Sequence, residues 1–189
     1  MTQGPPRHHL DARALVALAH PLRIRIRDRL RREGPATASQ LARLFGESSG
    51  ATSYHLRMLA RHGLVEPDPE RGKGRERWWR ATPGIFQIDV SELVQDDLGR
   101  DALRIASGEL HRLAEQRLQT WLNERERWSA PWRDGSENTA VALRLTADEM
   151  TTLRDQLSAL IEALIGRPES PGARNVEVEL NVFPTGKPE

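Results

Sequence analysis

The sequence predicts a mainly α-helical chain with smaller α+β parts, and three observations carry that prediction. Apolar residues recur at helical spacing over most of the 189 residues, clusters of Gly and Pro separate these stretches, and strict alternation is confined to short segments. With 38% hydrophobic residues the chain can build a core, while a mean hydropathy of −0.61 indicates that much of it faces water. This length fits one large domain or two small ones.

The first elements are set by prolines. Residues 1–9 are polar and contain two prolines, so we expect a disordered arm there. A helix is expected to begin near Leu10 or Asp11, and Pro21 suits the first turn of the next helix. The stretch LRIRIRDRL after Pro21 alternates like a strand and also repeats like a helix. The proline before it and the Gly-Pro pair after it favour a helix.

Two short helices follow, joined by a glycine turn. The stretch ATASQLARLF predicts a helix that is capped by Thr37 or Ser39, ends at Gly46, and buries Leu41, Leu44 and Phe45. The stretch ESSGATSYHLRMLARHG predicts a second helix with Ser48 or Ser49 as its cap. Helical periodicity gives this second helix a buried stripe of Thr52, Leu56 and Leu59. Its outward side then carries Ser49, Gly50, Ser53, Tyr54 and Arg57.

The segment LVEPDPERGKGRERWWRA predicts two short strands around a Gly-rich turn. The turn presents four cations, Arg71, Lys73, Arg75 and Arg77. Glycines let such a turn approach a phosphate backbone closely, and the cations supply affinity through counterion release. Because strand neighbours alternate, one of Trp78 and Trp79 should point into the core and the other outward.

The remaining chain contains one long helix and a small tail. From about Ser91 to Trp128 apolar residues recur at helical spacing, and a helix of this length needs a partner helix. The stretch SAPWRDGSEN predicts a loop and a domain boundary. Residues 138–184 then predict a strand-helix-strand unit: TAVALRLT and RNVEVELNVF alternate, and Thr146 with Glu149 forms a capping box between them.

Charge and motif together predict a DNA-binding function. Residues 1–82 carry 16 Lys and Arg against 8 Asp and Glu, whereas residues 83–189 carry 12 against 19, which indicates that only the first half meets a polyanion. Two helices with a tight turn, followed by a basic hairpin, make a winged helix-turn-helix in residues 10–82. We expect its second helix to enter the major groove of double-stranded DNA, with Ser48 added to the outward residues. Arg57 suits either a phosphate or a guanine.

The same residues resemble a known family. LVALAHPLRIRIRDRL is similar to the opening helices of ArsR-type regulators, and SGATSYHLRMLARHGLVEPDPERGKGRERWWRA resembles their recognition helix and wing; together the likeness covers about 75 residues. It implies a homodimer that reads a two-fold symmetric operator, usually as a repressor. Residues 83–128 would then be a linker and the long dimerisation helix. The tail (residues 138–184) would either sense a small-molecule effector or reinforce the dimer.

The departures from that family matter as well. Thiolate-sensing members carry a Cys-x-Cys pair where this chain has Thr37 and Ser39, and the chain contains no cysteine. Neither side chain is a soft-metal ligand, so sensing of arsenic, cadmium or copper by that route is excluded. His111 with Glu115 has helical spacing, but two ligands match by chance, and a solvated histidine explains them. We therefore predict no metal site and no cofactor.

Other classes of protein fit less well. The sequence has no G-x-S-x-G, no P-loop, no H-E-x-x-H and no cysteine nucleophile, so we predict no enzyme and no catalytic residues. A winged helix that binds protein instead of DNA is the alternative, although the predicted surface is polar and cationic. No stretch approaches the roughly 18 apolar residues of a membrane span, and no secretory signal is evident. We expect a cytoplasmic protein without membrane contact.

Overall fold

The computed structural model describes residues 7–71, 77–88, 97–165, 167–168 and 170–187. These residues fall into two compact units, Pro6–Leu113 and a second one that includes Ala114–Glu189. The division lies within the long helix α6 (Asp97–Glu124). A search of the described residues finds no helix that is both long and apolar enough to cross a membrane.

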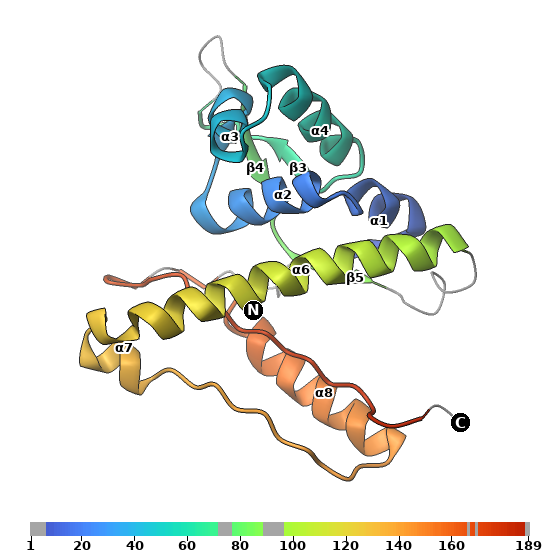
Figure 1. Ribbon diagram of the computed structural model, residues 1–189, viewed down its shortest axis with the longest axis vertical. Coiled ribbons are helices and arrows are strands. Elements are labelled where there is room, and N and C mark those ends of the chain that lie inside the picture. The colour runs from blue at the N-terminus through green and yellow to red at the C-terminus, as the bar shows by residue number, and fades with distance from the viewer. Residues whose placement is uncertain (1–6, 72–76, 89–96, 166, 169, 188–189) are drawn as a thin grey trace. The chain divides into compact units, whose positions relative to one another are not determined.

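The first unit is built around a bundle of short helices and two small sheets (Figure 1). Its elements are β1 (Arg7–Leu10), α1 (Ala12–Leu18), α2 (Pro21–Glu33), β2 (Ala36–Thr37), α3 (Ala38–Phe45), α4 (Ser49–Arg61), β3 (Val65–Pro67), β4 (Trp78–Ala81), β5 (Ile85–Ile88) and the start of α6. The expected disordered arm is wrong for residues 7–9, because β1 pairs in parallel with β5 and gains backbone hydrogen bonds there. Residues 1–6 lie outside the described residues.

Helix α2 resolves the ambiguity between strand and helix. Pro21 occupies its first turn, and the Nδ1 atom of His20 accepts a hydrogen bond from the Leu22 N–H at 3.2 Å. The apolar residues that fit the strand pattern and those that fit the helix pattern are all buried, because α2 packs against α4 on one side and against β4 on another. These residues are Leu22, Ile24, Ile26 and Leu30. A helix that is covered on two sides needs a wider apolar surface than a surface helix.

Helix α3 begins with a reciprocal cap. Thr37 Oγ1 accepts from the Gln40 N–H at 3.3 Å, and Gln40 Oε1 accepts from the Thr37 N–H at 2.9 Å. The helix ends at Gly46, whose φ of 70° lies in the left-handed region. The prediction that Leu44 is buried is wrong, because its side chain is 58% exposed. The buried face of α3 is centred on Leu41 and the adjoining Ala42, and Leu44 falls beside it.

The hairpin forms as predicted and gains a third strand. Strands β3 and β4 pair antiparallel, with Glu66 opposite Arg80, and β2 adds to the free edge of β4. An ion pair of 2.7 Å joins Arg80 Nη2 to Glu66 Oε1 across the hairpin. Trp79 is buried and Trp78 only partly so, which confirms the expected alternation.

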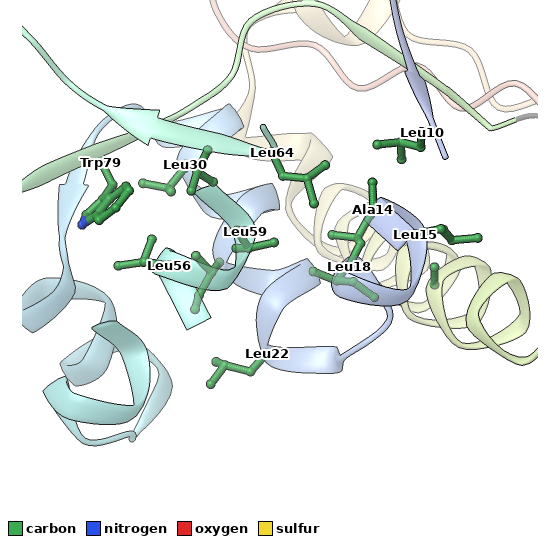
Figure 2. Packing of buried hydrophobic residues seen from close by; sticks show 14 of the residues in the cluster. Leu10, Ala14, Leu15, Leu18, Leu22, Leu30, Leu56, Leu59, Leu64 and Trp79 are labelled. Carbon is green, nitrogen blue, oxygen red and sulfur yellow. The ribbon is translucent and has the colours of Figure 1, made fainter. Parts of the chain in front are cut away.

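The core of the first unit joins the helices and most of the strands. Figure 2 shows side chains from α2, α4 and β4 converging on one interior, together with the leucine that follows α4. Burying a leucine of this kind contributes about 1.5–3 kcal/mol relative to leaving it exposed. The labelled members are Leu10, Ala14, Leu15, Leu18, Leu22, Leu30, Leu56, Leu59, Leu64 and Trp79. This packing holds the outward side of α4 and the base of the hairpin in fixed positions.

The second unit contains the rest of α6, a 3₁₀ turn (Arg125–Arg127), α7 (Ala130–Asp134) and α8 (Ala147–Glu162). The predicted capping box at the start of α8 is confirmed, since Thr146 and Glu149 exchange their hydrogen bonds. The predicted flanking strands are wrong for the described chain: residues 139–146 and 173–183 form no strand. A strand requires a ladder partner, and neither segment has one here. The predicted loop contains the short helix α7.

Candidate nucleic-acid interface

The outward side of α4 is polar, as the periodicity predicts. Thr52, Leu56 and Leu59 are fully buried. The opposite side presents Ser49, Gly50, Ser53, Tyr54 and Arg57, of which Ser53 is half-buried and the others are exposed. The whole stretch from Ser48 to Val65 contains no carboxylate. Glu47, just before this stretch, is exposed and near enough to act on His55, so the surface free of carboxylates begins at Ser48.

Ser48, which directly precedes α4 and was also predicted to contact DNA, has a structural role. The Ser48 hydroxyl oxygen accepts a hydrogen bond from the Ala51 N–H at 3.1 Å, so Ser48 is the N-cap of α4. Its carbonyl oxygen accepts from the Thr52 hydroxyl at 3.0 Å, which satisfies that buried hydroxyl. Ser48 is exposed, yet its side-chain acceptor is already used to start the helix.

Arg57 is held in place by its own helix. Its Nε donates to the Ser53 carbonyl oxygen at 3.1 Å, one turn earlier. That bond leaves the two terminal nitrogens of the guanidinium to other acceptors. No carboxylate pairs with Arg57 in the described part of the chain. The side chain is exposed and positively charged, and such a group binds phosphate or a guanine edge.

The described cations of the hairpin make cation–π contacts with aromatic rings. The Arg71 guanidinium lies 5.2 Å from the centre of the Trp78 ring, and Arg77 lies 5.5 Å from that of Trp79. Arg71 also approaches the buried Asp68, with 4.0 Å between Nε and Oδ2. Arg77 has no such carboxylate among the described residues. Lys73 and Arg75 lie outside the described residues, so their prediction is untested.

A cleft of about 370 Å³ brings three elements together. It is lined by Thr37, Ala38, Ser39, Ser53, Arg57, Arg77 and Trp79. These residues come from β2 and the start of α3, from the outward side of α4, and from β4 with Arg77 directly before it. Two guanidinium groups and three hydroxyls therefore face one space. In addition, helix geometry leaves the first N–H groups of α3 without acceptors inside the helix.

A histidine pair lies beside α4. The rings of His20, the cap of α2, and His55, on α4, have their centres 4.7 Å apart. Burial lowers the pKa of both histidines, and the nearby Arg23 charge lowers them further. For His55 the neighbouring His20 contributes as well. Both rings therefore favour the neutral form, and the Tyr54 ring packs edge-on against His55 at 5.5 Å.

Sequence reasoning identified most of this surface but missed the cleft. Ser53, Arg57 and Arg77 were predicted as DNA contacts, and all three line it. Thr37 and Ser39 were predicted as possible helix caps and as the places of an absent cysteine pair, and Trp79 as a packing residue, but none of them as a DNA contact. Their signal in the sequence was the capping position, since a helix start is a common place for anion contacts. The pairing of β2 with β4, which closes the cleft, could not be predicted from the sequence, because it involves only two residues of β2.

Residues 18–68 match the family described as a helix-turn-helix domain. A comparison with curated proteins finds no match. Among solved structures, the chain is similar to the adhesin competence repressor of Streptococcus pyogenes, at 16% identity, with a TM-score of 0.33 over 77% of this chain and 81% of that one. MarR of E. coli in its apo form gives 17% identity and a TM-score of 0.32 over 79% and 88%. RV1404 of Mycobacterium tuberculosis gives 19% and 0.30 over 82% and 83%. Likeness at this level does not establish a shared function.

Proposed function

We propose that this protein is a sequence-specific DNA-binding transcriptional regulator that acts as a homodimer on a two-fold symmetric operator and represses its target genes. The observation that carries the proposal is the cleft between α3, α4 and β4, where Arg57 and Arg77 converge with hydroxyl groups. The cleft lies in a helix-turn-helix domain, directly beside the polar outward side of α4.

The outward side of α4 suits the major groove. Small residues at its start, Ser49 and Gly50, let the backbone approach the base edges closely, and Tyr54 offers a hydroxyl and an aromatic ring. Tyr54 is 53% exposed although it is a large side chain. Because Leu56 and Leu59 anchor the opposite side in the core, the readout surface keeps a fixed orientation.

The cleft suits a phosphate of the DNA backbone. One of its guanidinium groups lies on α4 and the other directly before β4, so one phosphate held between them would fix the recognition helix and the wing together. The hydroxyls of Ser39 and Ser53 and the first N–H groups of α3 add neutral donors around the same space. Phosphate contacts of this kind set the register on the duplex, whereas base contacts by α4 set the sequence preference.

The homodimer is supported by α6. Along its 28 residues the helix buries small residues, Ala102 and Ala106 among them, against the core of the first unit. It exposes larger ones to solvent: Leu98, Ile105, Leu110 and Leu118. Leu98 and Ile105 are seven residues apart and so lie on one side of the helix, and exposed apolar side chains of this kind favour a partner helix. An isologous dimer would present two recognition helices related by a two-fold axis. That symmetry predicts a palindromic operator.

Two further features of the function follow from the sequence alone. An effector for the C-terminal unit is still a prediction, and a thermal-shift screen of the full chain with metabolites and metal ions tests it, because a ligand of the folded state raises the unfolding temperature. The alternative function is a winged helix that binds protein. It predicts weak dependence of binding on salt, whereas DNA binding through several cations predicts a steep one.

The test is a salt titration of DNA affinity. Fluorescence anisotropy of the full chain with a labelled duplex pool would be measured from 50 to 200 mM salt, conditions across which several phosphate contacts cost about 10³–10⁵-fold in affinity. Arg57→Ala and Arg77→Ala are each expected to lower the affinity and to reduce the logarithmic salt slope by about 1. Tyr54→Ala is expected to change sequence preference with little change in the slope.

The matched control is Arg154→Ala, which removes an exposed arginine from a helix of the other unit. It should leave the affinity and the salt slope unchanged. Equal losses for Arg57→Ala, Arg77→Ala and Arg154→Ala would mean that charge alone, without the cleft, drives binding. Absence of binding to any duplex at low salt would contradict the proposed function and favour the protein-binding alternative.

A further inference from the structure

Three aromatic rings contact one another in series between the start of α2 and the outward side of α4. The ring centres of His20, the cap of α2, and His55 lie 4.7 Å apart, and the two ring planes are tilted by 42°. His55 also contacts the Tyr54 ring edge-on, with 5.5 Å between the centres and 70° between the planes. His55, the middle ring, is half-buried, whereas Tyr54 is exposed. The exposed tyrosine of the readout surface is therefore packed against a ring that itself contacts α2.

The hydrogen bonding of both imidazoles suits the neutral form. His20 Nδ1 accepts a hydrogen bond from the Leu22 N–H at 3.2 Å, so this nitrogen carries no proton. His55 Nδ1 is buried and has no hydrogen-bond partner among the described residues. An imidazolium carries protons on both ring nitrogens. A charged His20 would therefore lose its cap of α2, and a charged His55 would bury an N–H group that has no acceptor.

The surroundings of the pair act in the same direction. Burial is the main reason that the pKa of each histidine is lowered, and the charge of Arg23 on α2 lowers both further. At His55 the neighbouring His20 also lowers the pKa, while Glu47, between α3 and α4, acts in the opposite direction on both rings. Tyr54 is the remaining titratable group that faces this cluster. Both rings are therefore neutral near pH 7 and take up protons as the pH falls below about 6.5.

We propose that His55 is a positioning residue for DNA readout: its neutral ring holds Tyr54 in its outward position, and a proton on the pair of His20 and His55 releases that hold. A charged His55 has to leave its place to bring Nδ1 to water or another acceptor, and Tyr54 then loses the ring against which it packs. The inference rests on the proposed function, in which Tyr54 contacts base edges.

The phosphate contacts should not share this dependence on pH. Arg57 and Arg77 take no part in the series of rings, and a guanidinium stays charged over this range of pH. A proton on the histidine pair also adds positive charge beside the DNA surface, which does not weaken binding to a polyanion. Sequence discrimination, and not affinity for DNA in general, is therefore the property that should fall with pH.

The first experiment follows Tyr54 without DNA. The chain contains a single tyrosine, so biosynthetic incorporation of 3-fluorotyrosine gives one ¹⁹F resonance, which would be recorded on the full-length protein from about pH 7.5 to about pH 5. We expect the resonance to shift with a midpoint below about 6.5. His55→Phe keeps a ring in the middle position but cannot be protonated there, and should remove most of the shift. The control variant, His111→Gln, changes an exposed histidine of α6 and should leave the shift in place.

The second experiment measures discrimination between two duplexes. Affinities for the palindromic duplex selected from random DNA and for a scrambled duplex of equal length would be measured by anisotropy at about pH 7.5 and pH 5.5, at one salt concentration. At the lower pH the ratio of the two affinities should fall at least about fivefold, the value of one weakened base contact. The affinity for the scrambled duplex should not fall. Circular dichroism at both pH values checks that each variant is folded.

Variants separate positioning from simple packing. His55→Phe should keep the ratio at both pH values, whereas His55→Ala should lower it at both, as Tyr54→Ala does. If His55 acts through Tyr54, the double variant of His55→Ala with Tyr54→Ala should discriminate no worse than Tyr54→Ala alone. Additive losses would overturn the inference, because His55 would then contribute by another route.

The remaining outcomes separate this inference from the proposed function. A wild-type ratio that does not change with pH, or one that falls equally in His55→Phe, would overturn the inference and leave the proposed function standing. A ¹⁹F resonance that does not titrate, or that titrates unchanged in His55→Phe, would overturn it as well. A titration that depends on His55, in a protein that does not discriminate between duplexes at any pH, would contradict the proposed function and support the hold of His55 on Tyr54.

Discussion

The two units of this chain have similar sequence patterns and very different interiors. Both contain amphipathic helices and short alternating segments, yet all buried hydrophobic residues of the described chain except Ala114 lie in Pro6–Leu113. In that unit α2, α4 and β4 cover one another. In the other unit most of the aliphatic residues of the segments that flank α8 are exposed, as is Leu160, and the remaining large apolar residues of α8 are only partly buried. A periodic pattern therefore predicts an element reliably, but it does not say which surface covers that element.

The largest expected difference between the units is in the cost of removing a leucine side chain. Leu41 is fully buried in α3, so Leu41→Ala should lower the free energy of unfolding of the first unit by about 2–5 kcal/mol. Leu160→Ala, at an exposed position of α8, should change that same transition by less than about 0.5 kcal/mol. Urea denaturation, followed by the fluorescence of the buried Trp79 in chains whose other four tryptophans are replaced by Phe, measures both.

The matched control lies in the same helix. Leu44→Ala removes the same atoms from α3 at an exposed position, and should also cost less than about 0.5 kcal/mol. If Leu44→Ala and Leu41→Ala were equally destabilising, the side of α3 that faces the core would be wrong. If Leu160→Ala were as destabilising as Leu41→Ala, the two units would share one core, which would contradict the difference between their interiors.

The next largest expected difference between the units is in how much an exposed arginine contributes to DNA affinity. Arg57→Ala should weaken DNA binding by about 10- to 100-fold, because hydrogen bonds to charged groups contribute about 1.5–3 kcal/mol. Arg154, an equally exposed arginine in α8, already pairs with Asp155 at 2.7 Å, and its replacement by Ala should have no effect. Anisotropy titrations at one fixed salt concentration compare the two. A loss for Arg154→Ala that matches the loss for Arg57→Ala would mean that overall charge, and not the surface of the first unit, drives DNA binding.

Replacing a glycine that has a left-handed conformation should give a smaller difference in stability between the two units. Gly46 ends α3 with φ of 70°, and Gly172 has φ of 82° in the second unit. Gly46→Ala should destabilise the first unit by about 1–2 kcal/mol, since side chains other than Gly are strained there. Gly172→Ala carries the same local strain but lies outside the packed unit, so the main unfolding transition should not move. Thermal unfolding followed at Trp79 tests the pair, and equal shifts would contradict the separation of the units.

The smallest expected effect is a dependence on pH that only the first unit shows. The pKa values of His20 and His55 lie below the ordinary value near 6.5, chiefly because of burial. The unfolded chain then binds protons at a higher pH than the folded one, so stability should fall as the pH drops from about 7 through 6.5 and level off below the depressed values. His55→Gln should flatten this dependence. Residues 114–189 contain no histidine.

Most of the first unit could be predicted from the sequence because its signals are local. Thr37 and Gly46 mark helix ends by hydrogen bonds or conformations that involve neighbours within a few residues, and Thr146 does the same in the second unit. Leu44 was placed wrongly because the width of a buried face depends on the neighbouring elements, which periodicity does not reveal. Strand β1 was missed for a similar reason, since its partner β5 lies more than 70 residues away.

The candidate site also has a part that could be predicted from the sequence and a part that could not. The outward side of α4 followed from helical spacing, with Thr52, Leu56 and Leu59 inside as predicted. The cleft did not follow, because it depends on the tertiary approach of Arg77 on the hairpin to Ser39 at the start of α3. The histidine pair also depends on tertiary packing, since its members come from α2 and α4. The flanking segments of α8 were predicted as strands from alternation that has no ladder partner in the described chain.

The most direct test of the account is a binding-site selection with the full chain on random duplex DNA, sequenced after several rounds and examined for symmetry. We predict a palindromic motif whose half-sites lie about one helical turn apart, because two recognition helices related by a two-fold axis read the same sequence twice. We also predict that the Arg57→Ala, Arg77→Ala double variant recovers little or none of it. No enriched motif at low salt would contradict the DNA-binding function assigned to the first unit.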